Sequence, residues 1–306
     1  MKSVPRGLAA RSAHKWAEAT ASAVPQRLRP ARTLSRGGGL VSSLSLHHNN
    51  LRLRLLSGKA GNRFEAPRAG AGDEARSTEQ VLPIFPLSIV ALPFSNVPLH
   101  IFEARYRVLF STLLYGEEGI EEGLANSESE FAGSKTFGMC YVDKEGNISS
   151  VGGVLEIGEH KLLDDGRLYI STSCSKRFTV TTVVQEQPVL ICNVEYLEDD
   201  LQVDEDPELQ KLAGEVVDVF EKALALGMSL EGSELKEPPK PEQLTLPPTE
   251  LSYWLASLFP QDPQEQQLML QIDTTKERLM RLKEIFDATY NYHLARNSIK
   301  SALSDE

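Results

Sequence analysis

The sequence predicts an α+β protein in which a small β-barrel of about six strands, with one early helix, precedes a helical bundle. Between residues 81 and 197, short apolar and β-branched runs alternate with turn residues, which is typical of an antiparallel barrel or sandwich. After residue 200, apolar residues recur at the spacing of amphipathic helices. Because the two patterns occupy separate halves of the chain, we do not expect a doubly wound sheet.

Residues 1–64 differ in charge from the rest of the chain. They contain twelve Lys and Arg residues and one acidic residue, Glu18, whereas the whole chain has a net charge of -11. A basic segment rich in Ser, Ala and Arg is typical of an organelle transit peptide, which we expect to be disordered. A basic disordered arm that binds an acidic partner is the alternative. Residues 65–80 are small and polar, and predict a disordered linker.

Residues 81–200 are predicted to form the barrel. The first segment, 81–90, contains Pro83 and Pro86 and is expected to be an edge or barrel-closing strand. A short strand at 97–101 precedes a helix that begins at Glu103 and ends at Gly116. The acidic segment 116–135 predicts a solvated loop insertion. Further strands are expected at 137–142, 148–155, 155–163, 168–173, 178–184 and 189–196, and Gly166 suits a tight hairpin between two of them.

Residues 201–306 are predicted to form the helical subdomain, with a Pro-rich linker near 231–248. Pro207 suits the first position of a helix that ends near Gly227. Three further helices are expected at 251–259, 263–270 and 274–299. Thr249 is the expected N-terminal cap of the first of these three.

Three segments resemble a known family. They are LPIFPLSIVALPFSNVPLHIFEARYR (82–107), VGGVLEIGEHKLLDDGRLYISTSCSKRF (151–178) and QQLMLQIDTTKERL (266–279). In this order they resemble the N-terminal domain of Lon proteases, particularly its stand-alone relatives. The resemblance implies a PUA-like pseudo-barrel joined to a helical bundle. Phe94 and Cys174 stand where family members commonly carry Gly, and the acidic insertion has no counterpart in the compact family pattern.

The resemblance also implies a function without catalysis. In full-length Lon this region engages unfolded or degron-bearing substrates, while an ATPase and a Ser-Lys protease act on them. The sequence contains no GxxxxGK[ST] loop, since Gly58-Lys59 is followed by Ala60. We therefore expect no enzyme, but a stand-alone organellar recognition protein that serves as an adaptor in proteolysis or quality control. The alternative is an assembly subunit that acts through its helical region. Stand-alone relatives in photosynthetic cells favour the chloroplast over the mitochondrion.

Unfolded or peptide segments, and an organellar protease, are the expected partners. The acidic net charge disfavours nucleic acid, and no stretch of about 18 apolar residues predicts a membrane span. A peptide needs an exposed apolar surface or an open sheet edge, and the candidates are the loop aromatics around Phe94 and the edge segment 83–86. Core packing of these aromatics and a protected edge are the favoured alternative. The side chains expected to contact peptides share an aromatic or cationic character and lie in or beside the first motif: Phe85, Phe94, His100, Phe102 and Arg105.

No catalytic, cofactor or metal site is expected. His100 beside Glu103 is a candidate general base, but a histidine that caps the helix or bonds the backbone is favoured. An ion pair is expected between Glu103 and Arg107. Cys174 is a candidate nucleophile, but a packed strand cysteine is favoured. The three cysteines predict free thiols, because their number is odd and their spacing wide. His160 and His293 are expected at the surface or its boundary.

Overall fold

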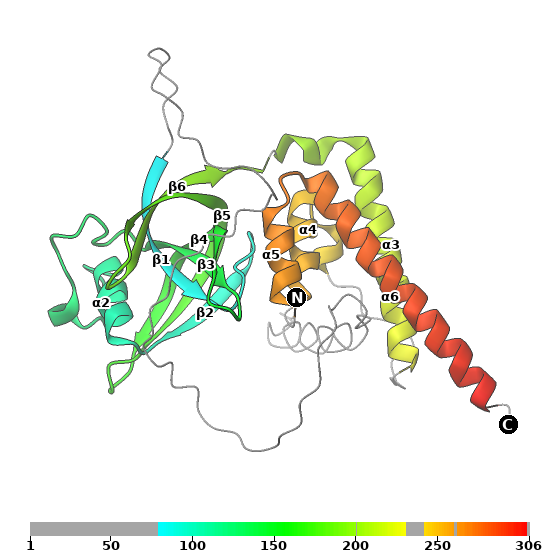
Figure 1. Cartoon of the computed structure of the whole chain (residues 1–306), viewed down its shortest axis with the longest axis horizontal. Coiled ribbons are helices and arrows are strands. Elements are labelled where there is room, and N and C mark those ends of the chain that lie inside the picture. Colours follow the sequence, from blue (N-terminus) through cyan, green and yellow to red (C-terminus); the bar gives the residue numbers. More distant parts are fainter. Residues whose placement is uncertain (1–78, 200, 231–241, 260–261, 305–306) are drawn as a thin grey trace, which may run out of the picture.

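The computed structural model describes residues 79–199, 201–230, 242–259 and 262–304 (Figure 1). The predicted transit peptide, all but the last two residues of the predicted linker 65–80, and residues 231–241 of the Pro-rich linker lie outside these ranges. The strands are β1 (Glu79–Leu87), β2 (Asn96–Ile101), β3 (Thr136–Val142), β4 (Ile148–Leu162), β5 (Leu168–Gln185) and β6 (Leu190–Leu197). The helices are α2 (Ala104–Leu113), α3 (Pro207–Leu230), α4 (Pro248–Ser257), α5 (Pro263–Gln271) and α6 (Thr275–Ser304), with short 3-10 turns at Glu122–Leu124, Leu201–Glu205 and Glu242–Thr245.

The six described strands form one sheet in the order β2-β5-β4-β3-β1-β6, and β6 also pairs with β5 to close a barrel. Strand β1 is parallel to β3, and the other pairs are antiparallel. Helix α2 lies beside the barrel, and the other helices form a separate layer in which α3 and α6 run side by side (Figure 1). The predicted α+β fold class, with one early helix before a helical bundle, is confirmed.

Of the two roles predicted for the first strand, edge or barrel-closing, the structure shows the barrel-closing one. Strand β1, with Pro83 and Pro86, lies between β3 and β6, so it closes the barrel and is not an edge. Proline is tolerated there because each proline removes only one ladder donor. Strand β2 is the edge strand, because β5 is its single partner among the described strands.

Two pairs of predicted strands are continuous. The segments 148–155 and 155–163 form the single strand β4, and the segments 168–173 and 178–184 belong to β5. Register shifts between Val154 and Leu155, and between Ile157 and His160, mark irregularities at which the strands continue. A bulge interrupts the alternation of buried and exposed residues without ending the strand, which explains the misreading. At the predicted hairpin between β4 and β5, Gly166 has φ of +79°, as expected.

The barrel strands separate two apolar clusters. Neighbouring residues of β1 point alternately into them, with Phe85 in the cluster beneath α2 and Ile84 in the other. Glycine is required where β4 approaches the β1–β2 loop, since a Cβ on Gly153 would lie 2.7 Å from Cys174 Sγ and 2.8 Å from the Ala91 carbonyl oxygen. A third cluster fills the helical layer and includes Leu92 from the β1–β2 loop. The two halves therefore share a packed boundary.

Two local predictions are wrong. Thr249 does not cap α4, because it lies inside that helix and its hydroxyl donates to Asp204 at 2.7 Å. Arg107 does not pair with Glu103; it pairs with Glu121 in the acidic insertion. Glu103 instead accepts from Arg105 at 3.0 Å. The long guanidinium side chain of Arg107 reaches a loop partner that helical spacing does not reveal.

Candidate functional site

The structure places the five predicted contact residues in four different environments. Phe85 is 6% exposed and packs edge-on against Tyr106 and Phe110. Its ring belongs to the core beneath α2 and is not presented to a peptide. The other four residues reach the surface, so the structure does not bring the predicted set together at one point.

His100 and Phe102 form an aromatic patch with Tyr169, a residue that sequence reasoning missed. The His100 ring stacks on Tyr169 with centroids 4.4 Å apart and planes 9° apart, and the Phe102 centroid lies 5.9 Å from that of His100. Phe102 is 63% exposed and Tyr169 is 47% exposed. Tyr169 lies opposite His100 in the β2–β5 ladder, a pairing that only the strand register reveals.

His100 was expected to cap the helix or bond the backbone, and it does neither through Nε2. That atom is buried and has no hydrogen-bond partner among the described residues, and α2 begins without a side-chain cap. Stacking on Tyr169 positions the ring instead. Glu103 accepts its hydrogen bond from Arg105, and no hydrogen bond joins it to His100 Nε2 among the described residues.

The patch borders the open edge of β2. The backbone N–H of Cys174 donates to the carbonyl oxygen of Ser95 at 2.9 Å. This bond shows which backbone groups of β2 point toward β5. Backbone groups of an antiparallel strand alternate in direction, so those of Asn96, Pro98 and His100 point away from β5. Pro98 has no N–H to offer, which shortens the free run and limits indiscriminate strand pairing. This edge and the aromatic rings beside it are the surface best suited to an extended chain.

Phe94 lies at the boundary between barrel and helices. Its φ is 63°, a left-handed conformation that favours glycine, which agrees with the glycine expected there from the family resemblance. Its N–H donates to the Cys174 carbonyl oxygen at 2.9 Å, and its ring lies 6.1 Å from that of Tyr253 in α4. The ring is 51% exposed. A non-glycine residue held in this region stores about 1–2 kcal/mol of strain.

Arg105 lies in a groove on the side of α2 that faces the acidic insertion. Its guanidinium lies 4.5 Å from the centroid of the Tyr106 ring and pairs with Glu103 at 3.0 Å. Burial raises the pKa of the Tyr106 hydroxyl, while the neighbouring Arg105 charge opposes that change. The groove has a volume of about 490 Å³.

A buried ionic cluster fixes the barrel to the helices. Arg177 of β5, 2% exposed, donates to the carbonyl oxygens of Leu270 and Ile272 at 2.9 Å each, and these end helix α5. Arg177 and Arg278 each approach Asp199 Oδ1 at 3.1 Å. Cationic side chains are favourable at a helix C-terminus, where unpaired carbonyl groups carry partial negative charge.

Tyr253 completes this cluster. Its hydroxyl donates to Asp199 Oδ2 at 2.9 Å, and the Arg278 guanidinium lies 3.8 Å from the centroid of its ring. Burial raises the pKa of Tyr253, so its hydroxyl keeps the proton that it donates. Arg177 lies in the second sequence motif and Arg278 in the third. The two motifs therefore meet across the boundary to build the fold, a role distinct from that of the exposed aromatic patch.

The nucleophile and surface-histidine hypotheses have different outcomes. The three cysteines are free and buried, and burial raises the pKa of Cys174 to about 12, as expected for a packed thiol.

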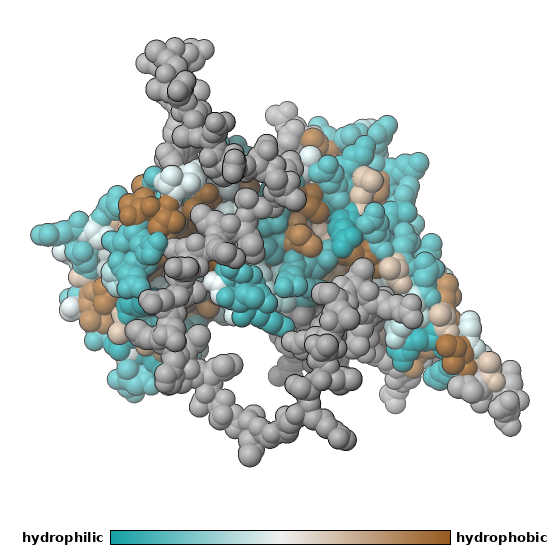
Figure 2. Space-filling model, in the orientation of Figure 1, coloured by the Kyte–Doolittle hydropathy of each residue, from teal (hydrophilic) through white to brown (hydrophobic). Residues whose placement is uncertain are grey.

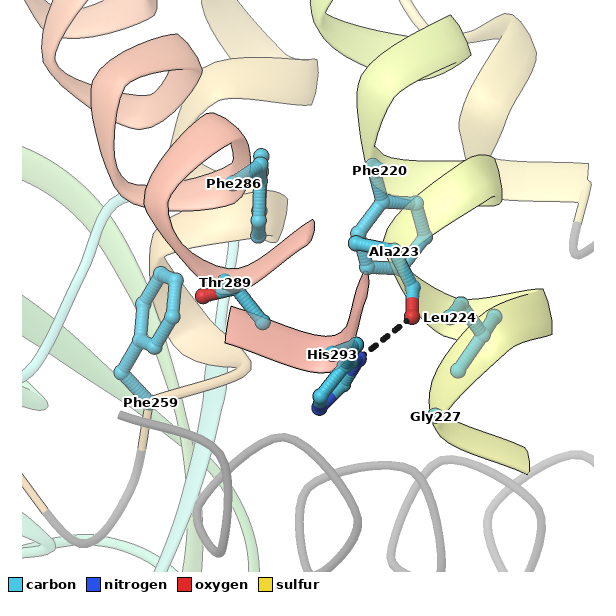
Figure 3. A pocket seen from close by; sticks show the side chains of 8 residues that line it. All are labelled: Phe220, Ala223, Leu224, Gly227, Phe259, Phe286, Thr289 and His293. Carbon is cyan, nitrogen blue, oxygen red and sulfur yellow. Dashed lines mark hydrogen bonds between the residues drawn. The ribbon is translucent and has the colours of Figure 1, made fainter. Parts of the chain in front are cut away.

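His293 was expected at the surface, but it is 4% exposed and its Nδ1 donates to the Ala223 carbonyl oxygen at 3.0 Å. This bond links α6 to α3 beside a cavity of about 10 Å³ (Figure 3). His160 contacts the Glu118 carbonyl oxygen at 2.8 Å.

Metal-ligand clusters and membrane-spanning helices are both absent from the described residues. Within them, no group of three or more His, Cys, Asp or Glu side chains is arranged to hold a metal ion. No helix in the described ranges combines the length and apolar character needed to cross a membrane. On the face shown in Figure 2, hydrophobic residues gather in separate patches over both the barrel and the helical side.

The barrel, its open edge and its exposed aromatic rings define an α+β protein with surfaces of the kind that bind other proteins. Residues 81–288 match the family of the ATP-dependent protease La (LON) substrate-binding domain. The match covers more than half of the 306 residues, and the chain belongs to this family. No ATPase or protease domain is matched in the chain.

Individual relatives show the extent of the similarity. Over 231 residues the chain is 24% identical to a Lon protease of Treponema pallidum (strain Nichols), which covers 71% of this chain and 23% of that protease. The chain therefore spans less than a quarter of that relative. A Lon N-terminal domain protein from Xanthomonas campestris is 23% identical, with a TM-score of 0.45 over 66% of this chain and 96% of its own. The N-terminal domain of a Mycobacterium avium complex Lon protease is 14% identical, with a TM-score of 0.48 over 68% and 98%.

Proposed function

We propose that this protein recognises unfolded or degron-bearing protein segments without transforming them, and that it acts as an adaptor in organellar proteolysis or quality control. Its membership of the LON substrate-binding family carries the proposal. The open edge of β2 supports it, because an extended segment can add backbone hydrogen bonds there while its side chains contact Phe102 and Tyr169. The raised pKa of Cys174 weighs against a thiol nucleophile.

Binding to unfolded protein tests this proposal directly. The full chain should bind a permanently unfolded model protein and ignore the folded form of the same protein, as measured by fluorescence anisotropy. Replacing Phe102 and Tyr169 by alanine should weaken binding about tenfold, because exposed aromatic contacts contribute about 1–2 kcal/mol. Tyr115→Ala is the matched control, since Tyr115 is also 47% exposed and lies outside the patch. Equal binding of folded and unfolded protein would contradict the proposal.

The adaptor role and the compartment need separate tests. Crosslinking in organelles should recover an organellar protease together with unfolded clients; recovery of clients alone would remove the adaptor role. For the compartment we propose the chloroplast, with the mitochondrion as the alternative, on the basic composition of residues 1–64. Determining the N-terminus of the protein purified from tissue tests both cleavage and compartment.

A second candidate is an assembly subunit that uses its helical region. Leu294 and Ile299 on α6 are 40% and 61% exposed, so α6 leaves apolar side chains uncovered that a dedicated partner can bury. Native mass spectrometry distinguishes the two candidates. One stoichiometric partner that is lost in the Ile299→Glu variant supports assembly, whereas heterogeneous clients that persist in this variant support recognition.

A further inference from the structure

A second surface of the barrel has the properties of a selective binding groove. It lies between α2, the acidic insertion and the turn that joins β5 to β6. Its lining comes from these elements, from β1 and from the adjoining ends of β5 and β6: Pro83, Ala104, Arg105, Val108, Leu109, Thr112, Asn126, Ser129, Phe131, Gln185, Pro188, Val189 and Ile191.

The insertion forms one wall, and several contacts fix that wall in place. Arg107 of α2 pairs with Glu121, and Lys135 pairs with Glu117 at 2.6 Å. The Asn126 N–H donates to Thr112 Oγ1 at 3.0 Å, which joins the insertion to α2 inside the groove. The insertion is therefore anchored at both ends and in its middle. It is a built part of the surface and not only the solvated loop that its composition predicted.

The interior of the groove is mainly apolar. Val108 is 40% exposed, and Phe131 contributes a half-buried ring from the insertion. The polar lining side chains already have partners within the protein. Ser129 Oγ accepts from the Phe131 N–H at 3.2 Å, and Gln185 Nε2 donates to the Val189 carbonyl oxygen at 3.1 Å. A ligand therefore meets a surface that suits apolar side chains.

Three exposed carboxylates belong to residues next to the groove lining. Glu128 and Glu130 flank Ser129 on the insertion, and Glu186 follows Gln185 at the end of β5. In the part of the chain that the structure describes, no ion pair is formed by these three carboxylates, whereas the charge of Arg105 is matched by Glu103. Unpaired charges of one sign around a cleft attract ligands of the opposite sign.

We propose that this groove binds extended, unfolded segments in which apolar side chains are flanked by Lys or Arg. The apolar interior takes the hydrophobic side chains, and the carboxylates next to the groove lining attract the flanking cations. The proposal rests on the proposed recognition function and deepens it, since it names a site and a class of client. The insertion absent from the compact family pattern supplies one wall, so this preference belongs to this chain.

Two matched peptides test the preference. Each has the same apolar centre, flanked in one by Lys and in the other by Glu, and its binding to the full chain is followed by fluorescence anisotropy. We expect the Lys-flanked peptide to bind at least about tenfold more tightly at low salt, with the difference shrinking as ionic strength rises. In the variant E128Q/E130Q/E186Q the difference should fall below about threefold. The control E145Q/E156Q/E208Q removes the same charge at exposed positions outside the groove and should keep the full difference.

A second pair of variants tests the interior. Val108→Gln places a longer polar side chain in the groove and should weaken binding of the Lys-flanked peptide about tenfold. Ile89→Gln makes the same kind of change at a residue that is 47% exposed, in the β1–β2 loop outside the groove, and should leave binding unchanged. If Val108→Gln fails to fold, the carboxylate variants still decide the outcome.

The outcomes separate this proposal from the broader one. Unaltered peptide binding in both groove variants, together with retained binding of unfolded protein, overturns the groove and leaves the recognition function standing. Failure of the wild-type chain to bind any unfolded protein overturns both. A dimer that Val108→Gln converts to a monomer identifies a second copy as the occupant, and a tenfold gain in peptide affinity on deleting residues 1–64 identifies the chain's own basic segment. Either result also overturns the proposal.

Discussion

Replacing Asp199 by asparagine should strongly destabilise the protein. The Asp199 carboxylate is 11% exposed and lies between the guanidinium groups of Arg177 and Arg278, which are 2% and 0% exposed. It also accepts from the Tyr253 hydroxyl at 2.9 Å. Asparagine preserves the shape but removes the charge, and its amide N–H groups cannot accept from a guanidinium. Two buried cations would remain without an anion.

The size of the effect follows from the burial of these groups. Removing one partner of a buried ion pair costs about 3–5 kcal/mol, because the remaining charge stays desolvated and unpaired. Arg177 keeps its bonds to the carbonyl oxygens of Leu270 and Ile272, and the asparagine oxygen still serves Tyr253, so we expect a loss near 3 kcal/mol. This is a large fraction of the total of about 5–15 kcal/mol that is usual for a folded protein.

Urea unfolding followed by circular dichroism measures this loss. The midpoint should fall with an unchanged slope, because the surface exposed on unfolding is the same. Asp165→Asn provides the control: Asp165 also bonds an arginine, Arg167, but both side chains are about half exposed, so its removal should matter far less. If Asp199→Asn lowers the free energy of unfolding by less than about 1 kcal/mol, the Asp199 carboxylate is not needed to stabilise the buried guanidinium groups of Arg177 and Arg278.

Three further predictions concern other parts of the barrel. Gly153→Ala should lower the free energy of unfolding by about 1–3 kcal/mol, because the new Cβ would lie 2.7 Å from Cys174 Sγ. Gly158→Ala is the control, since the nearest atom to its Cβ is 3.5 Å away. Equal thermal midpoints of the two variants would contradict this prediction. Glu121→Gln should speed amide hydrogen exchange within 116–135 but not in β3, and unchanged exchange would show that the pair with Arg107 does not hold the insertion. Burial raises the pKa of Cys174 to about 12 and of Cys192 to about 11, so above about pH 9 the unfolded state loses thiol protons that the folded state keeps. Stability should therefore fall from about pH 9 to 11, less steeply in Cys174→Ala, and an identical pH profile of that variant would sink the assignment.

Hydrophobic periodicity predicted the α+β class because it depends on neighbours along the chain. The helix at α2 and the turn at Gly166 follow from local spacing and local backbone preference. The continuity of β4 and β5 could not be predicted in this way. At the bulges the alternation breaks although the ladder goes on, and a broken alternation looks like the end of a strand.

Contacts between distant segments were the least predictable. Helical spacing offered Glu103 as the partner of Arg107, but the actual partner, Glu121, belongs to a loop. His293 was expected at the surface or its boundary, yet it lies seven residues after Phe286 on the buried face of α6 and bonds α3. In the candidate site, aromatic character marked His100 and Phe102, whereas Tyr169 becomes their neighbour only through the register of β2 on β5.

The pairing of β1 with β6 also constrains how the barrel can be made. Strand β1 pairs antiparallel with β6, residues 190–197, which lie more than a hundred positions later in the chain. Contacts so distant along the chain form slowly, because the intervening loop must close before they stabilise anything. A ribosome that has released only part of this sequence therefore holds a β1 with one side unpaired. Any factor that shields nascent chains would have its longest time to act on this segment.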